Sequence, residues 1–340
     1  MPQELPLLPT VCVGSYASPG WFIAAQRLAR EGQMGDQEVN ELLDDAVTVC
    51  VNDQLDAGID ILSDGEFRRQ RFVFELFDAL EGLERLPVSR RLGVPGYDRA
   101  PRFRRIAPVK ASCGLGTVAE FGALKRRAPH MPLKIALPGP LTFAAFISAE
   151  GEAISDLFSE LQGLVRQEID ALVAAGCNYI QLDEPGLTIT PHGLSLGAAA
   201  DAINRVLAGI PANTAVHVCF GNNAGRPFAD RRLGRIMPAL QLLRCKQLML
   251  EFANREMAEL DLLKPLSEQF SVAAGVIDVK NFHVETADDV AQRLNRCLAY
   301  ISPERLTVTA DCGFSALPRH LARAKMRAMT AGARLVRDRL

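Results

Sequence analysis

Residues 178–185 read NYIQLDEP, a short apolar run that ends in two acidic residues and a proline. A run of this length that ends at a helix-breaking residue is typical of a buried strand. The residues that follow, 193–208, repeat their apolar positions at helical spacing. We therefore expect a strand and then a helix, which is the repeating unit of folds with a parallel sheet.

The same pair of signals recurs along the 340 residues of the chain. Seven more strand candidates lie at residues 10–15, 59–66, 133–140, 214–220, 247–252, 271–278 and 306–313, and helical spacing covers residues 37–57, 153–175, 286–300 and 318–336. Eight strands that alternate with helices predict an α/β fold, a TIM-type (β/α)8 barrel, as a single domain over residues 1–340. An open, doubly wound sheet is the alternative.

Residues 84–115 interrupt this alternation. They are rich in Arg and Pro and contain a further strand candidate at residues 107–112. A long segment between two strands that lacks the helical pattern is usually an excursion from the main fold. We predict an inserted hairpin or lid after the second strand.

Composition limits the partners that the protein can have. The chain is 48% hydrophobic, which indicates a sizeable core, and 38 basic against 40 acidic residues give a net charge of −2. It therefore lacks the cationic field that holds nucleic acid or an anionic membrane. The sequence shows no signal-peptide pattern and no long apolar run, so we expect a cytoplasmic protein. Its eight scattered cysteines favour free thiols or metal ligands over disulfides.

Polar residues gather where the predicted strands end. In TIM barrels the catalytic groups come from these carboxyl ends, which meet at one mouth. A single acidic residue there usually caps a helix or forms an ion pair, but groups at seven strand ends predict a shared site. They are Ser15, Asp64, Glu66, Asp183, Glu184, His217, Cys219, Glu251, Asp278, Asp311 and Cys312.

The pair His217-x-Cys219 is the sharpest of these signals. Side chains two residues apart on a strand point to the same face, so the imidazole and the thiol project together. Glu251 ends the next strand and Cys312 ends the last one. Two thiols, an imidazole and a carboxylate form a ligand set that suits zinc. Because no compact Cys-x₂₋₄-Cys module is present, we predict a catalytic zinc that deprotonates a substrate thiol for alkylation.

Taken together, the strand-end motifs resemble the catalytic domain of cobalamin-independent methionine synthase over about residues 9–336. The motifs are Val13-Gly14-Ser15, Asp64-Gly65-Glu66, Gly139-Pro140-Leu141-Thr142, Gln181-Leu182-Asp183-Glu184-Pro185, His217-Val218-Cys219, Leu250-Glu251, Gly275-Val276-Ile277-Asp278 and Asp311-Cys312-Gly313. The resemblance implies methyl transfer from a methylated folate to zinc-bound homocysteine. It also implies that the zinc ligands are His217, Cys219, Glu251 and Cys312.

The resemblance assigns further roles. Glu66 and Asp183 would hold the amino group of homocysteine, and Ser15 would meet its carboxylate. Phe146 stands where the family has a tryptophan that packs on the pterin, and Lys280 stands where it has a proton-donating histidine. We expect Phe146 at the donor site and Lys280 as proton donor. The full synthase also has an N-terminal barrel, and this chain resembles only the catalytic half.

Other functions fit the same motifs. The wider barrel superfamily includes epoxide:coenzyme M transferases, which alkylate a different thiol, and barrels similar to uroporphyrinogen decarboxylase that use no zinc. Loss of turnover in a zinc-binding barrel is a further alternative. Paired carboxylates favour an acceptor with an ammonium group, whereas Lys280 and the basic stretch 68–71 favour an anionic one. We expect the partners to be a small-molecule thiol and an alkyl donor, and the protein to be a monomer or homodimer.

Overall fold

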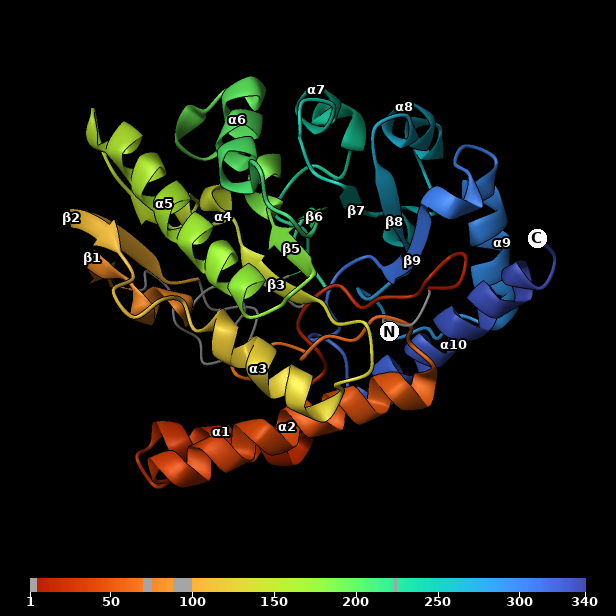
Figure 1. The fold of residues 1–340 in the computed structure, drawn as a ribbon, viewed down its shortest axis with the longest axis horizontal. Helices are drawn as coiled ribbons and strands as arrows, with labels where there is room; N and C mark the ends of the chain where they lie inside the picture. The colour runs from red at the N-terminus through yellow and green to blue at the C-terminus, as the bar shows by residue number, and fades with distance from the viewer. Residues whose placement is uncertain (1–4, 70–74, 88–99, 223–224) are drawn as a thin grey trace.

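The computed structural model describes residues 5–69, 75–87, 100–222 and 225–340, and its centre is a parallel sheet (Figure 1). Within these residues the sheet contains six regular strands whose order in space follows their order in the chain. They are β3 (Ile135–Pro138), β5 (Tyr179–Asp183), β6 (Asn213–Val218), β7 (Gln247–Glu251), β8 (Ser271–Ile277) and β9 (Leu306–Ala310).

Two short extended segments close this sheet into a barrel. Parallel bridges join Thr10 to Val308, Val11 to Ile61, and Leu62 to Leu133, which lies just before β3. Asp60 adds a side-chain contact between these two segments, because its Oδ2 accepts from both N and Oγ1 of Thr10 at 2.8 Å. The eight predicted strand segments thus form a closed circle. The barrel is confirmed, and the open sheet is excluded.

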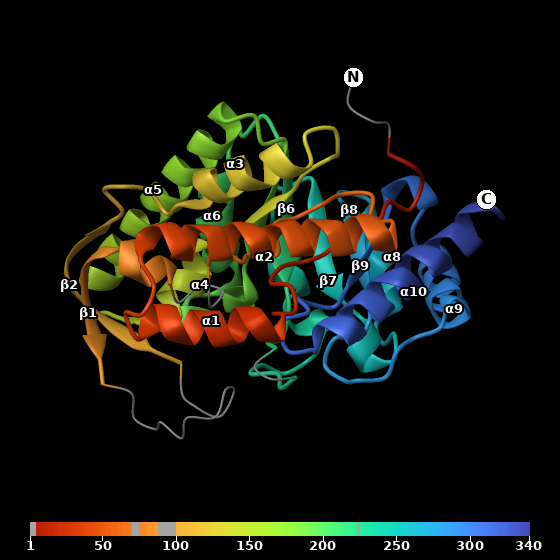
Figure 2. The ribbon, with the colours of Figure 1, turned by 90° about the horizontal axis from the view of Figure 1, so that it is seen from below.

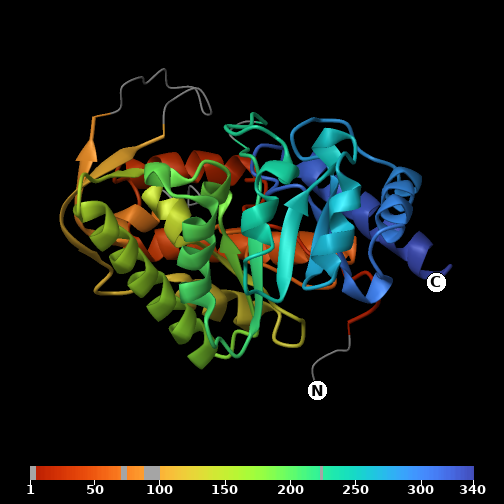
Figure 3. The same ribbon diagram turned by 90° about the horizontal axis from the view of Figure 1, so that it is seen from above.

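Helices cover the outside of the barrel (Figures 1 and 3). The five predicted helices are confirmed within three residues at each end, whereas the helices at 20–30, 117–127, 140–144, 237–240 and 263–267 were not anticipated. None of the helices in the described ranges is both long enough and apolar enough to span a membrane. The helices are α1 (Gly20–Arg30), α2 (Asp36–Ala57), α3 (Thr117–Arg127), α4 (Pro140–Ala144), α5 (Ala153–Ala174), α6 (Leu196–Leu207), α7 (Met237–Leu240), α8 (Leu263–Ser267), α9 (Ala287–Leu298) and α10 (Arg319–Arg337).

The barrel interior changes from apolar to polar along the strands. Near the amino ends, the inward side chains form a small buried cluster of Val11, Val13, Ile61, Tyr179, Ala215, Met249 and Ala273. Two residues further along three of these strands, the inward positions carry Gln181, His217 and Glu251, all buried. Strand alternation explains this pattern, because every second residue faces the interior. The polar end of the barrel is therefore the place for chemistry.

The predicted insertion is an antiparallel hairpin of β1 (Glu81–Leu86) and β2 (Arg102–Lys110), to which the short β4 (Ile147–Ser148) adds in parallel. The strand expected at 107–112 is β2, which begins five residues earlier because Arg102–Arg105 pair with β1. Arg105 and Glu160 of α5 tie the hairpin to the barrel wall at 2.6 Å. Figure 2 shows it at one end of the molecule. Residues 88–99 lie outside the described residues, so the predicted lid stays a prediction.

Candidate metal and substrate site

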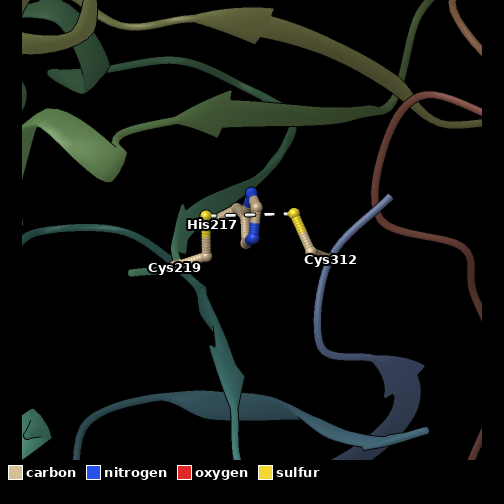
Figure 4. Close-up of side chains that lie close together, drawn as sticks. All are labelled: His217, Cys219 and Cys312. Atoms are coloured by element: carbon tan, nitrogen blue, oxygen red, sulfur yellow. Dashed lines mark hydrogen bonds between the residues drawn. The ribbon is translucent and has the colours of Figure 1, made fainter. Parts of the chain in front are cut away.

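His217, Cys219 and Cys312 converge at the polar end of the barrel (Figure 4). His217 lies on β6, Cys219 directly follows that strand, and Cys312 lies two residues beyond β9. One ligand atom from each residue lies within 4.8 Å of the others, and the two sulfur atoms are 3.9 Å apart. Among the described residues, these three form the group of histidine, cysteine or acidic side chains whose ligand atoms lie close enough together to hold a metal ion. The sequence placed these three side chains together, and the structure does the same.

The imidazole of His217 is oriented by Asp183. The two residues are register partners on β5 and β6, and Nδ1 of His217 lies 2.8 Å from Oδ1 of Asp183. A carboxylate at Nδ1 fixes the tautomer that leaves the lone pair on Nε2, an arrangement common behind metal-binding histidines. Among the described residues, this buried Nε2 has no hydrogen-bond partner. Burial opposes protonation, but Asp183 outweighs it and raises the pKa of His217, so a metal ion would compete with a proton for Nε2.

The two thiols lie within hydrogen-bond distance of each other, with their sulfur atoms 3.9 Å apart. The hydrogen bond between Cys312 and Cys219, aided by the charges of His217 and Lys280, lowers the pKa of Cys312 to about 7. The same hydrogen bond, together with burial, raises the pKa of Cys219. Only one thiolate is therefore favoured near neutral pH. A bound cation would be needed to hold both sulfurs deprotonated.

Glu251 stands beside this cluster, but its carboxylate is turned toward Lys280. Its Oε2 accepts from Lys280 Nζ at 2.8 Å and from the backbone N–H of Phe220 at 3.3 Å. The other oxygen, Oε1, is buried without a hydrogen-bond partner among the described residues. Glu251 thus lies close enough for its charge to act on both thiols and outside the 4.8 Å group.

A second cluster, which we call the carboxylate pocket, contains Asp64, Glu66, Glu120 and Asp183. All four residues are buried, and within the described ranges each keeps one oxygen without a hydrogen-bond partner. Ser15 donates its hydroxyl to Glu66 Oε2. Burial raises the pKa of Glu66; Arg69 opposes this rise, and Asp183 adds to it. Burial also raises the pKa of Glu120, to about 8.

Arg69 and Lys134 are buried cations of this region. The sequence suggested Arg69 only as part of a basic stretch that favours an anionic acceptor, and it suggested no role for Lys134. Arg69 lies 3.3 Å from Glu120 and 3.5 Å from Glu66. Arg68 instead points outward to Asp44, and position 71 lies outside the described residues. The signal for Lys134 was present in the sequence, because a lysine within the apolar run 133–140 is unusual unless it is paired.

Several acidic strand ends serve the backbone instead of a ligand. Glu184 accepts from the N–H groups of Leu141 and Thr142 at the start of α4. Asp311 accepts from three successive N–H groups at 252–254, at 2.6 to 2.9 Å. Asp278 accepts from the backbone of its own loop. Capping therefore explains more of the strand-end pattern than the sequence analysis allowed.

Phe146 packs in an aromatic group on the side of the inserted hairpin. Its ring lies edge-on to Phe77 at 6.3 Å, and Phe77 in turn stacks on Phe103 of β2 at 4.2 Å. Phe146 is partly buried against the core. The structure thus places it where the barrel meets the hairpin, and its role at a donor site remains a prediction.

The fold and this site define a TIM-type barrel with a cluster at its mouth that could hold a metal ion. A family described as "Cobalamin-independent synthase, Catalytic domain" matches residues 8–335. The chain belongs to this family. It is 32% identical over 339 residues to a protein named methionine synthase from Saccharolobus islandicus, and 33% identical to one from Sulfurisphaera tokodaii. Each match covers 99% of this chain, together with 97% and 95% of the two relatives. The two relatives are therefore about as long as this chain.

Solved structures agree with this assignment. A B12-independent methionine synthase from Shewanella, in complex with selenomethionine, superposes with a TM-score of 0.80 at 27% identity and covers 98% of both chains. A putative vitamin-B12-independent methionine synthase from Listeria monocytogenes has a TM-score of 0.75 at 18% identity and covers 98% of this chain and 99% of its own. The second match supports the fold alone.

Proposed function

We propose that the protein binds one zinc ion through His217, Cys219, Cys312 and Glu251, and that it methylates homocysteine to methionine. The observation that carries this proposal is the His217, Cys219 and Cys312 cluster, with its unpartnered Nε2, next to the carboxylate pocket. One nitrogen, two sulfurs and a carboxylate fit the ligand preferences of zinc. When bound, the ion would keep the thiol of the substrate deprotonated at neutral pH.

The carboxylate pocket supports an acceptor that carries an ammonium group. Its four carboxyl groups are buried, and within the described residues Arg69 is the cation that pairs with them, at Glu66 and Glu120. A buried carboxylate oxygen that lacks a hydrogen bond is costly, and an ammonium group between Glu66 and Asp183 would supply a hydrogen bond to each of them. Ser15 donates its hydroxyl to Glu66, and in the proposed complex this hydroxyl would turn to the acceptor's carboxylate. Two of the basic residues that favoured a sulfonate acceptor, Arg69 and Lys280, already pair with carboxylates.

The transfer itself needs one proton to leave and one to arrive. The acceptor loses its S–H proton, an S–CH₃ bond forms, and the bond from the methyl group to the donor breaks with its electron pair on the donor. Lys280 is the proposed source of the proton that the donor then takes up. Burial lowers and Glu251 raises the pKa of Lys280, and the rise prevails. The side chain is therefore charged, but it is a weaker acid than an exposed lysine, which counts against its role as proton donor.

The first expected result concerns the metal. Purified protein should contain about one zinc per chain, and removal by a chelator should abolish methyl transfer while the barrel stays folded. Zinc is measured by atomic emission, and activity by a screen of methyl donors (methylated folate, its polyglutamate and other methyl donors) with homocysteine. Protein that is free of metal and fully active, or that prefers 2-mercaptoethanesulfonate to homocysteine, would contradict the proposal.

The second expected result is a pH dependence of product binding. Methionine has no thiol, and its ammonium group stays charged below about pH 8, so only the protein titrates. The pKa of Glu66 is raised. As the pH falls, Glu66 therefore loses its negative charge at a higher pH than an exposed glutamate does. Methionine affinity, measured by calorimetry, should therefore weaken as the pH falls from 8 to about 4.5, the ordinary pKa of a glutamate, with a shallower slope in Glu66→Gln. Affinity that is constant or rises over this range would oppose the assignment.

A further inference from the structure

A chain of buried hydrogen bonds runs from Lys134 through Gln181 and Asp183 to His217. We propose that Lys134 and Gln181 are positioning residues, which fix the direction in which His217 presents Nε2 to the metal. This inference rests on the proposed zinc site and concerns residues that would not touch the ion. It gives Asp183 a role behind the metal centre in addition to its proposed role with the acceptor.

The chain begins with a fully buried ammonium group. Lys134 Nζ donates to the carbonyl oxygens of Cys12 and Val13, at 2.5 and 2.6 Å, and to Oε1 of Gln181. These three acceptors use all three N–H groups of a lysine. Burial lowers the pKa of Lys134 to about 8, so the ammonium form still prevails at neutral pH. The lysine therefore has a fixed position inside the barrel.

The fixed ammonium decides which way the amide of Gln181 points. With Oε1 facing Lys134, the NH₂ group faces Asp183, and Nε2 donates to Asp183 Oδ1 at 2.6 Å. The flipped amide would place its NH₂ group against the ammonium and its oxygen against a carboxylate, and both contacts are repulsive. Lys134 thus excludes the flipped amide, and Gln181 always offers a donor to Asp183.

Asp183 links the amide of Gln181 to the ring of His217. Its Oδ1 accepts from Gln181 and lies 2.8 Å from Nδ1 of His217. Because the oxygen is held from the other side, it cannot turn away from the ring. Strand register builds the arrangement: Gln181 pairs with Ala136 and Asp183 with His217, while Lys134 shares the inward face of Ala136.

Removal of a group that orients a metal-binding side chain typically lowers metal affinity about 10- to 100-fold. We expect an effect of this size here. Gln181→Glu is nearly isosteric and can still pair with Lys134, but it turns a carboxylate oxygen toward Asp183. Its zinc affinity, measured by competition with a chelator, should fall about 10- to 100-fold. Lys134→Met removes the ammonium, leaves the amide able to flip, and should lower zinc affinity in the same direction.

A second measurement follows the ring itself. In metal-free protein, at a pH where the ring is neutral, ¹⁵N NMR should place the proton of His217 on Nδ1, and both variants should give a mixture of tautomers. The matched control is Gln247→Glu, a buried glutamine inside the barrel that bonds to Tyr179 and Thr307 instead. It should keep zinc affinity and ring tautomer.

Wild-type zinc affinity together with a pure Nδ1–H ring in Gln181→Glu and Lys134→Met would overturn the positioning role. If one variant failed to fold, the other would decide. If wild-type protein took up no zinc at all, the proposed function would fail, and the ring measurement on metal-free protein would still decide whether Lys134 and Gln181 orient His217.

Discussion

Replacing Cys312 with serine is expected to remove zinc and to lower kcat/KM by more than about 100-fold. The loss should exceed the 10- to 100-fold that partners of metal ligands contribute, because a ligand itself is lost. Serine has nearly the same shape, and Cys312 lies in the loop after β9, where it is only partly buried. The barrel should therefore stay folded. Zinc content, steady-state rate and thermal unfolding are measured on the same sample.

Cys245→Ser is the matched control. Cys245 precedes β7, at the opposite end of the strands from the cluster, and its thiol donates to the carbonyl oxygen of Gln247 at 3.3 Å. This variant should keep both zinc and rate. Cys312→Ser with full zinc content and near wild-type turnover would show that the ligand set is wrong.

Replacing Glu66 with glutamine is expected to raise KM for homocysteine by about 10- to 100-fold and to leave zinc content unchanged. The estimate follows from the roughly 1.5 to 3 kcal/mol that a hydrogen bond to a charged group contributes, at about 1.4 kcal/mol per factor of ten. Glu66 tests ammonium recognition more cleanly than Asp183, because Asp183 also holds His217. The change keeps the shape of the side chain, so Ser15 can still contact it.

The acceptor series separates recognition from general damage. An acceptor without an ammonium group, such as 2-mercaptoethanesulfonate, should lose nothing in Glu66→Gln and gain affinity, since a negative charge has been removed. Glu304→Gln is the control, because this exposed residue precedes β9 at the far end of the barrel. An equal loss of affinity for both acceptors would mean that Glu66 supports the fold of this region and does not bind the ammonium group.

The sequence by itself determined the barrel and most of the metal cluster. The alternation of side chains along a strand and the position where a strand ends depend only on neighbouring residues. Eight apolar runs were therefore sufficient to predict the barrel, and the spacing of His217 and Cys219 was sufficient to place them on one face. Cys312 could be added because all parallel strands of a barrel end at the same mouth. The hairpin between β1 and β2 was anticipated as an interruption of the pattern, although its start at Glu81 was not.

Only the tertiary structure decided which polar groups face one another. Glu184 and Asp311 share the strand-end position of the site residues, yet they bind backbone N–H groups. Glu251 was expected among the metal ligands, and its carboxylate turns toward Lys280. Lys134 lies 83 residues from His217 in sequence and three hydrogen bonds away in space. Register between strands sets such contacts, and it depends on how the whole sheet closes, which no local pattern encodes.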